Sequence, residues 1–154
     1  MKINLLTVGK SHDIKLVESI NDFTNRLDKY YATNWTIVTA KQNSIIAIQK
    51  QLEAEQLLDQ LHKDDWVILL DERGKQYNNT EVANMIQTKA NNSFKRLVFI
   101  IGGAFGVDDL VLKRANMVWS LSLLVFPHMI VRLMLAEQLY RACTINRNEK
   151  YHHI

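Results

Sequence analysis

The 154-residue sequence has few of the residues that mark specialised classes of protein. Its single cysteine, Cys143, excludes an intramolecular disulfide and argues against a thiolate metal site. The residues around Cys143 are apolar, which indicates a buried thiol. One proline and five glycines leave no Pro-rich or Gly-rich linker, and the sequence has no internal repeat. We therefore predict a single domain over residues 1–154.

Long apolar runs and a strong excess of one charge are also missing. No stretch approaches the roughly 18 apolar residues of a membrane span. The apolar part of the N-terminus, MKINLLTVGKSHD, is too short for a secretory signal. These absences favour a cytoplasmic protein without a membrane partner. The net charge of +3 and the isoelectric point near 9.0 permit a polyanionic partner without requiring one.

Short apolar segments alternate with segments of helical periodicity along the chain. Apolar residues from Leu16 to Tyr31, for example, recur at spacings of three and four, which is typical of a helix with one apolar face. Strands are predicted at 2–8, 35–40, 66–71, 96–103 and 117–125, and helices at 14–31, 44–62, 81–91 with Thr80 as N-cap, about 108–116, and over the first two thirds of 125–154. Because parallel neighbours need a crossover between them, this alternation predicts an α/β fold with a mostly parallel sheet of about five strands and helices on both faces.

Ligands of open parallel sheets bind beyond the carboxyl ends of the strands, where three loops stand out. They are LLDERGK at 69–75, IIGGAFG at 100–106, and SLSLLVF at 120–126 leading into Pro127. Gly102 and Gly103 allow a backbone to approach a ligand closely, although a plain tight turn explains them as well. GGAFG matches neither the dinucleotide fingerprint nor a phosphate loop, which argues against nicotinamide and nucleoside triphosphate ligands. For Asp71, at a strand end, we favour a turn cap over a ligand contact.

Charged side chains interrupt the apolar stretch VFPHMIVRLMLAEQLYRA at 125–142. At roughly 100° per residue, Arg132 lies within about 40° of His128, and Glu137 lies within about 40° of Arg141. Apolar side chains occupy almost every other direction, and such a helix is normally buried on all sides. A homodimer interface would bury it in a chain of this size. Glu137 and Arg141, four residues apart, are also suited to an intrahelical ion pair.

The C-terminal tail NRNEKYHHI combines cations and aromatic rings in a short irregular stretch. Such a mixture can bind phosphates and stack on a flipped base, whereas a frayed terminus is the alternative. Two adjacent histidines without a third ligand do not make a convincing metal site, so we predict no metal.

Taken together, five segments resemble the ribosomal RNA large subunit methyltransferase H family of the SPOUT superfamily: KINLLTVGK, LLDERGK, VFIIGGAFG, SLSLLVFPHMIVRLMLAEQLYRA and the terminal YHH. The resemblance runs from residue 2 to residue 153 and is most specific in FPH…VR…EQLYRA. It implies an α/β domain with a C-terminal trefoil knot and an obligate homodimer. It also implies S-adenosylmethionine-dependent methylation of ring nitrogen 3 of a pseudouridine, in a stem-loop of large-subunit (23S) rRNA, free or in the assembled ribosome.

The resemblance also implies site residues. Tyr151 and His152 would help hold the target base, and Arg132 would bind RNA or order the site across the dimer. No residue is identified as a general base. Cofactor contacts would fall in the three strand-end loops, on Leu70, Gly102, Leu121, Ser122, Leu123, Leu124, Val125 and Phe126.

The sequence departs from the family pattern in two regions. Many relatives carry Arg-Gly-x-Pro where this chain has Arg147, Asn148, Glu149 and Lys150, and a basic residue follows their Tyr-His where this chain has His153 and Ile154. Residues 41–56 also match poorly.

Two other functions fit parts of the sequence. A ribosome-associated RNA-binding protein without catalysis could use the same scaffold, and binding of S-adenosylmethionine discriminates against it. A flavodoxin-like nucleotide-binding protein fits the alternation of strands and helices. It explains neither the apolar final helix nor the Tyr-His tail.

Overall fold

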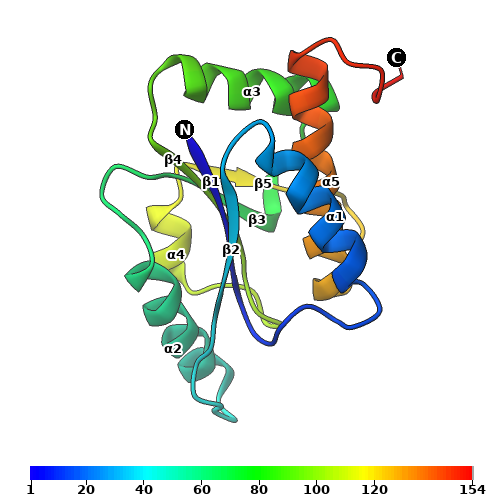
Figure 1. Ribbon diagram of the computed structural model, residues 1–154. Helices are drawn as coiled ribbons and strands as arrows, with labels where there is room; N and C mark the ends of the chain where they lie inside the picture. Colours follow the sequence, from blue (N-terminus) through cyan, green and yellow to red (C-terminus); the bar gives the residue numbers. More distant parts are fainter. Residues whose placement is uncertain (154) are drawn as a thin grey trace.

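Five parallel strands form one sheet in the computed structural model, which describes residues 1–153 and leaves Ile154 outside the described residues (Figure 1). The strand order is β2-β1-β4-β3-β5, and every pair of neighbouring strands is parallel. The strands are β1 (Lys2–Val8), β2 (Thr33–Val38), β3 (Trp66–Lys75), β4 (Arg96–Ile101) and β5 (Met117–Trp119). The predicted α/β class is confirmed.

Five helices connect the strands and cover both faces of the sheet. They are α1 (Val17–Asp28), α2 (Ile46–Asp59), α3 (Asn79–Asn91), α4 (Asp109–Arg114) and α5 (His128–Asn146). Side chains of α1, α3 and α5 pack in one apolar cluster, and those of α2 and α4 pack in another on the opposite face (Figure 1). Within residues 1–153, no helix is long and apolar enough to cross a membrane.

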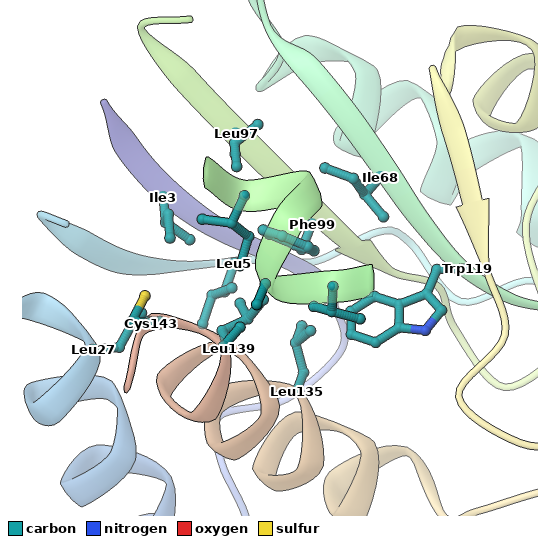
Figure 2. Packing of buried hydrophobic residues seen from close by; sticks show 14 of the residues in the cluster. Ile3, Leu5, Leu27, Ile68, Leu97, Phe99, Trp119, Leu135, Leu139 and Cys143 are labelled. Atoms are coloured by element: carbon teal, nitrogen blue, oxygen red, sulfur yellow. The ribbon is translucent and has the colours of Figure 1, made fainter. Parts of the chain in front are cut away.

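The side chains of β1 show how one apolar segment supplies both faces. Ile3 and Leu5 belong to the cluster under α5, whereas Leu6 and Val8 belong to the cluster under α2. This division follows from the alternation of side chains along a strand. On the α5 face, residues of the sheet pack against Leu135 and Leu139 of the helix, and Cys143 is buried there as predicted (Figure 2).

β5 ends earlier than its sequence predicts, at Trp119 instead of residue 125. The partner strand β3 continues to Lys75, whose carbonyl oxygen accepts a hydrogen bond from Ser120 N at 3.0 Å. Gly74 makes this extended pairing possible, because a Cβ there would lie 2.6 Å from the carbonyl carbon of Val118. Residues 120–126 therefore leave the sheet and become available to line a site.

Other boundaries also differ from prediction. α3 is capped by Asn78 and not by Thr80, because Asn78 and Glu81 form a reciprocal capping box. β2 begins at Thr33, two residues before its predicted start, and α1 is shorter than predicted at both ends. Pro127 directly precedes α5 as its N-cap.

Replacing Leu139 with Ala tests the contribution of the α5 face to stability. The side chain is fully buried between α5 and the sheet, so we expect the free energy of unfolding to fall by about 2–5 kcal/mol. Urea unfolding monitored by circular dichroism measures the change. The matched control is Leu123→Ala, at a leucine that is 88% exposed, which should change the same quantity by less than about 0.5 kcal/mol. Equal effects of the two variants would contradict this account of the core.

Candidate functional site

A cleft of about 820 Å³ opens at the carboxyl ends of β3 and β4. Three segments supply most of its wall: residues 70–73 in the second half of β3, residues 101–107 from the last residue of β4 onward, and residues 121–126 between β5 and α5. Lys50 of α2 and two residues from the start of α5, His128 and Val131, complete the lining. These segments are the three that were singled out from the sequence.

Seven of the eight residues predicted to contact a cofactor line this cleft: Leu70, Gly102, Leu121, Ser122, Leu124, Val125 and Phe126. The exception is Leu123, whose side chain is 88% exposed and does not line it. A local turn accounts for this orientation. Ser120 Oγ donates to the Ser122 carbonyl at 2.9 Å, and Leu124 N donates to Ser122 Oγ at 3.0 Å. The bond that each of these residues makes with a ligand stays a prediction.

Close packing surrounds the two glycines at the end of β4, Gly102 against Val107 of the same loop and Gly103 against Glu53 of α2. A Cβ on Gly102 would lie 2.6 Å from Val107 Cγ1, and a Cβ on Gly103 would lie 2.6 Å from Glu53 Oε2. Gly106 returns the chain with a φ of 79°, and its N–H donates to the Gly103 carbonyl at 3.1 Å. The pair therefore forms a tight turn, and the same lack of side chains leaves the backbone of the loop open to the cleft.

Asp71 and Arg73 form an ion pair on the rim of the cleft. Arg73 Nε donates to Asp71 Oδ1 at 2.8 Å and Arg73 Nη2 donates to Oδ2 at 2.9 Å. The backbone N–H of Arg73 donates to the same carboxylate at 2.9 Å, as in a turn cap. The hydrogen bonds from Arg73 hold the pKa of Asp71 below its usual value. The favoured structural role of Asp71 is thus confirmed.

Arg132 lies beneath the wall of the cleft with no exposed surface. Its Nε donates to His128 Nε2 at 3.0 Å, and its Nη1 donates to His12 Nδ1 at 3.1 Å. Its Nη2 is buried and, within the described chain, has no hydrogen-bond partner. The helical periodicity predicted the proximity of His128, but nothing in the sequence pointed to His12, which comes from the loop after β1.

Both imidazoles beside Arg132 are held in their neutral form. Burial lowers the pKa of His128 and of His12, and the charge of Arg132 lowers both further. Burial also lowers the pKa of Arg132. Two roles were predicted for Arg132, binding RNA and ordering the site across the dimer. Its complete burial leaves no guanidinium surface for RNA within one subunit, and the role across the dimer stays a prediction.

Tyr151 and His152 fold back onto the far end of α5. Tyr151 donates from its hydroxyl to Glu137 Oε1 at 2.9 Å, and Arg141 Nη1 donates to His152 Nδ1 at 3.2 Å. Arg141 Nε also donates to Glu137 Oε1 at 3.0 Å, which confirms the predicted intrahelical ion pair. These contacts make the tail an ordered part of the fold.

Two features peculiar to this chain's tail support that arrangement. Asn148 has a φ of 55°, a left-handed conformation that favours glycine and that asparagine tolerates better than most residues. Glu149 accepts a hydrogen bond from the hydroxyl of Tyr30, a residue that follows the C-terminal end of α1. Asn148 thus adopts a conformation that glycine, the residue of many relatives here, adopts readily, and Glu149 ties the tail to another element.

The tail and the cleft lie at opposite ends of α5 within one chain. His128 borders the cleft, and Arg141 contacts His152. The thirteen residue steps of helix from His128 to Arg141 correspond to about 20 Å. The side of α5 between these ends is only partly buried at Met129, Ile130, Leu133 and Met134. A second hollow of about 470 Å³ lies along it, lined in part by Phe23, Leu121, Leu133 and Met134.

No group of three or more His, Cys, Asp or Glu side chains in the described part of the chain is placed to hold a metal ion. Tyr151, His152 and Arg132, the three residues predicted to act on the base or the RNA, are not brought together within one subunit. Arg132 contacts histidines near the cleft, and the other two contact Glu137 and Arg141.

Comparison with known proteins places the chain among methyltransferases. A family model described as predicted SPOUT methyltransferase matches residues 1–152. A protein from Cytophaga hutchinsonii named ribosomal RNA large subunit methyltransferase H is 41% identical, over 99% of this chain and all of the relative. A protein of the same name from Parabacteroides distasonis is 38% identical over 99% of each chain.

Solved structures of low sequence identity share the fold. A probable methylase family protein from Haemophilus influenzae Rd KW20 has a TM-score of 0.56 at 13% identity, over 99% of this chain and 70% of the other. A probable methyltransferase from Bordetella pertussis Tohama I has a TM-score of 0.58 at 10% identity, over 92% of this chain and 95% of the other.

The two histidines beside Arg132 predict a pH dependence of stability. Their folded-state pKa values lie below the value of 6.5 expected in the unfolded chain. Below pH 6.5 the folded protein therefore binds fewer protons than the unfolded chain does. The stability that depends on these neutral imidazoles is fully present above that pH and is lost as the pH falls through the folded-state values. Urea unfolding between pH 7.5 and 5.5 should show this loss. The variant His12→Gln/His128→Asn should have a flatter profile, and an unchanged slope would refute the assignment.

Proposed function

The chain belongs to the SPOUT methyltransferases and, within them, to the ribosomal RNA large subunit methyltransferase H family, and on this premise we propose its substrate, cofactor and assembly. It is a methyltransferase that acts on large-subunit ribosomal RNA. The proposed reaction transfers the methyl group of S-adenosylmethionine to ring nitrogen 3 of a pseudouridine in a stem-loop of 23S rRNA. The substrate, free rRNA or the assembled ribosome, places the reaction in the cytoplasm.

The cleft at the carboxyl ends of β3 and β4 is the observation that carries the cofactor proposal. Its volume of about 820 Å³ falls within the range of about 300–1,000 Å³ that is usual for small-molecule sites. Apolar side chains of Leu121, Leu124, Val125 and Phe126 line it and suit the faces of an adenine. Residues 120–126 lie outside the sheet, so most of their backbone groups are free to bond the polar edges of a ligand. The residues present therefore fit S-adenosylmethionine.

S-adenosylmethionine, when bound, supplies an activated methyl group on a sulfonium. Transfer of this group to a nitrogen would be an in-line displacement. Correct placement of the nucleophile provides much of the catalysis of such a reaction, so the protein's task is to hold the base in line with the methyl group. Loss of the proton from ring nitrogen 3 leaves an anion that a nearby cation or N–H donor stabilises. His152 and Arg141 are such groups, and we assign no general base.

Tyr151 is suited to hold the base with its ring. Burial and the hydrogen bond to Glu137 raise the pKa of its phenol, so the hydroxyl stays protonated and donates to Glu137. The guanidinium of Arg141 lies 4.8 Å from the ring centroid on one side. An aromatic ring fixed in this way offers a stacking surface for a base that has been turned out of its stem-loop.

A homodimer would bring the tail of one subunit to the cleft of the other. The partly buried apolar side of α5 suits a two-fold interface, in which the same surface of each subunit meets its copy. If two α5 helices cross in opposite directions there, the C-terminal end of each lies toward the N-terminal end of its partner. That arrangement spans the 20 Å or so that separate Tyr151 and His152 from the cleft within one chain. The C-terminal trefoil knot of the family and a single SPOUT domain over residues 1–154 complete the proposal.

The proposed activity is tested with the purified protein and with cells that lack its gene. Isothermal titration calorimetry should detect binding of S-adenosylmethionine, and mass spectrometry of rRNA should show loss of one methylated pseudouridine in the deletion strain. Re-expression of the wild-type gene is the control and should restore the methyl group. Binding of rRNA without binding of S-adenosylmethionine would instead favour an RNA-binding protein without catalysis. An unchanged methylation pattern would contradict the proposed substrate.

Mixing two inactive variants tests whether the tail acts on the partner's cleft. His152→Ala should lack the base contact, and Leu124→Arg should place a long cation in the cleft, where it repels a sulfonium. Leu124 is largely exposed, so the second variant should fold. Random exchange of subunits makes half of the dimers mixed, each with one intact site, and restores about a quarter of wild-type activity.

Each variant alone provides the baseline for this experiment, and analytical ultracentrifugation establishes that both are dimers. No recovery of methyl transfer after subunit exchange would show that tail and cleft act within one chain, and a monomeric wild-type protein would overturn the dimer.

A further inference from the structure

His128 joins α5 to the ends of two central strands of the sheet. Its Nε2 lies 3.2 Å from Thr7 Oγ1, near the end of β1, and the carbonyl of Ile101, the last residue of β4, lies 3.1 Å from the same oxygen, so the one hydroxyl hydrogen of Thr7 can donate to either group. Thr7 and Ile101 are also partners in the parallel ladder. The imidazole thus lies beside the point where β4 gives way to the Gly102–Gly103 turn.

The hydrogen bond from Arg132 determines which nitrogen of His128 carries the proton. A guanidinium has only donors, so the Nε2 that receives Arg132 Nε at 3.0 Å must be unprotonated. A neutral imidazole with an unprotonated Nε2 carries its hydrogen on Nδ1. A second positive charge next to the buried guanidinium is unfavourable, so the neutral form persists.

The other ring nitrogen, Nδ1, is left to donate, and Gly102, which directly follows Ile101, is the neighbouring residue of the cleft wall. An interaction with the backbone of Gly102 acts to raise the pKa of His128, against the larger effects of burial and of Arg132. Because Nε2 is occupied by Arg132, the group available to the Gly102 carbonyl is Nδ1–H. Both His128 and Gly102 line the same cleft.

We propose that His128 is a positioning residue for methyl transfer: Arg132 fixes its imidazole as the neutral Nδ1–H tautomer, and this N–H holds the Gly102 peptide in place at the cofactor cleft. Arg132 then acts through His128 and touches neither cofactor nor RNA. The identity of the ligand held by Gly102 rests on the proposed function, whereas the tautomer does not.

This role accounts for a cation that is buried without a carboxylate partner. In the described part of the chain, the side-chain hydrogen bonds of Arg132 go only to imidazole nitrogens. An acidic partner would neutralise the guanidinium but could not define the proton position on His128. His12 accepts a hydrogen bond from Nη1 of Arg132 and thereby helps to hold the guanidinium in the position from which its Nε donates to His128.

Long-range ¹H–¹⁵N spectra of the ¹⁵N-labelled full-length protein at pH 7.5 test the tautomer directly. The His128 ring, assigned by its disappearance in His128→Asn, should give the pattern of an Nδ1–H imidazole. Replacing Arg132 with Met should convert that pattern to a mixture of tautomers. An Nε2–H or a protonated ring in the wild-type protein would overturn the inference, whether or not the protein binds S-adenosylmethionine.

Two amide variants test the consequence for the cleft. The amide nitrogen of Asn occupies about the position of Nδ1, so His128→Asn preserves the donor toward Gly102 and should keep the Kd for S-adenosylmethionine within about threefold. The amide of Gln extends instead toward the position of Nε2, so His128→Gln should weaken binding about tenfold, as for loss of one hydrogen bond.

Thermal unfolding separates positioning from a general loss of structure. Equal affinities for the Asn and Gln variants, or a tenfold loss in His128→Asn with an unchanged unfolding temperature, would overturn the positioning role. Failure of the wild-type protein to bind S-adenosylmethionine would contradict the proposed function instead, and the tautomer spectra would then decide the inference on His128.

Discussion

The hydrogen-bond ladder of β3 with both β4 and β5 brings the carboxyl ends of three strands to one edge of the sheet. The three segments that form most of the cleft lie at or just after the C-terminal halves of those strands. The extension of β3 to Lys75 ends β5 at Trp119 and releases residues 120–126 toward the cleft. Gly74 permits this by leaving room for the backbone of Val118. The lack of a side chain at Gly74 of β3 thus determines where residues 120–126 leave the sheet and line the cleft.

The strand ends could be located from the sequence because the apolar runs are short and are followed by glycine or charge. The segments 69–75 and 100–106 were placed at the site for that reason, whereas Leu70 and Gly102 were assigned to the cofactor by the family resemblance. The end of β5 could not be found in this way, since SLSLLVF alternates like a strand and only the long-range bond between Ser120 and Lys75 interrupts the ladder. Local pattern carries no information about such a partner.

The surroundings of Arg132 and the tail illustrate the same limit. The spacing of four residues between His128 and Arg132 predicts their contact, because it follows from helix geometry alone. His12, which lies 120 residues from Arg132 in the chain, gives no local signal, and neither does the bond between Tyr30 and Glu149. Side chains that meet through tertiary structure were therefore missed, whereas those on one element were found. Burial of a guanidinium without a carboxylate partner costs free energy, and under the proposed role its value to the protein lies in the orientation of its neighbours.

α5 carries a wall of the cleft at one end and the tail's anchoring residues at the other. Adding or removing one residue between them would turn the two ends relative to each other by about 100° and shift them by about 1.5 Å. If the tail and the cleft act together as proposed, the side chains of this helix can change in evolution, but its length has to be kept. Insertions and deletions among related chains should gather elsewhere, such as the irregular segment between β2 and α2, where no functional distance has to be kept.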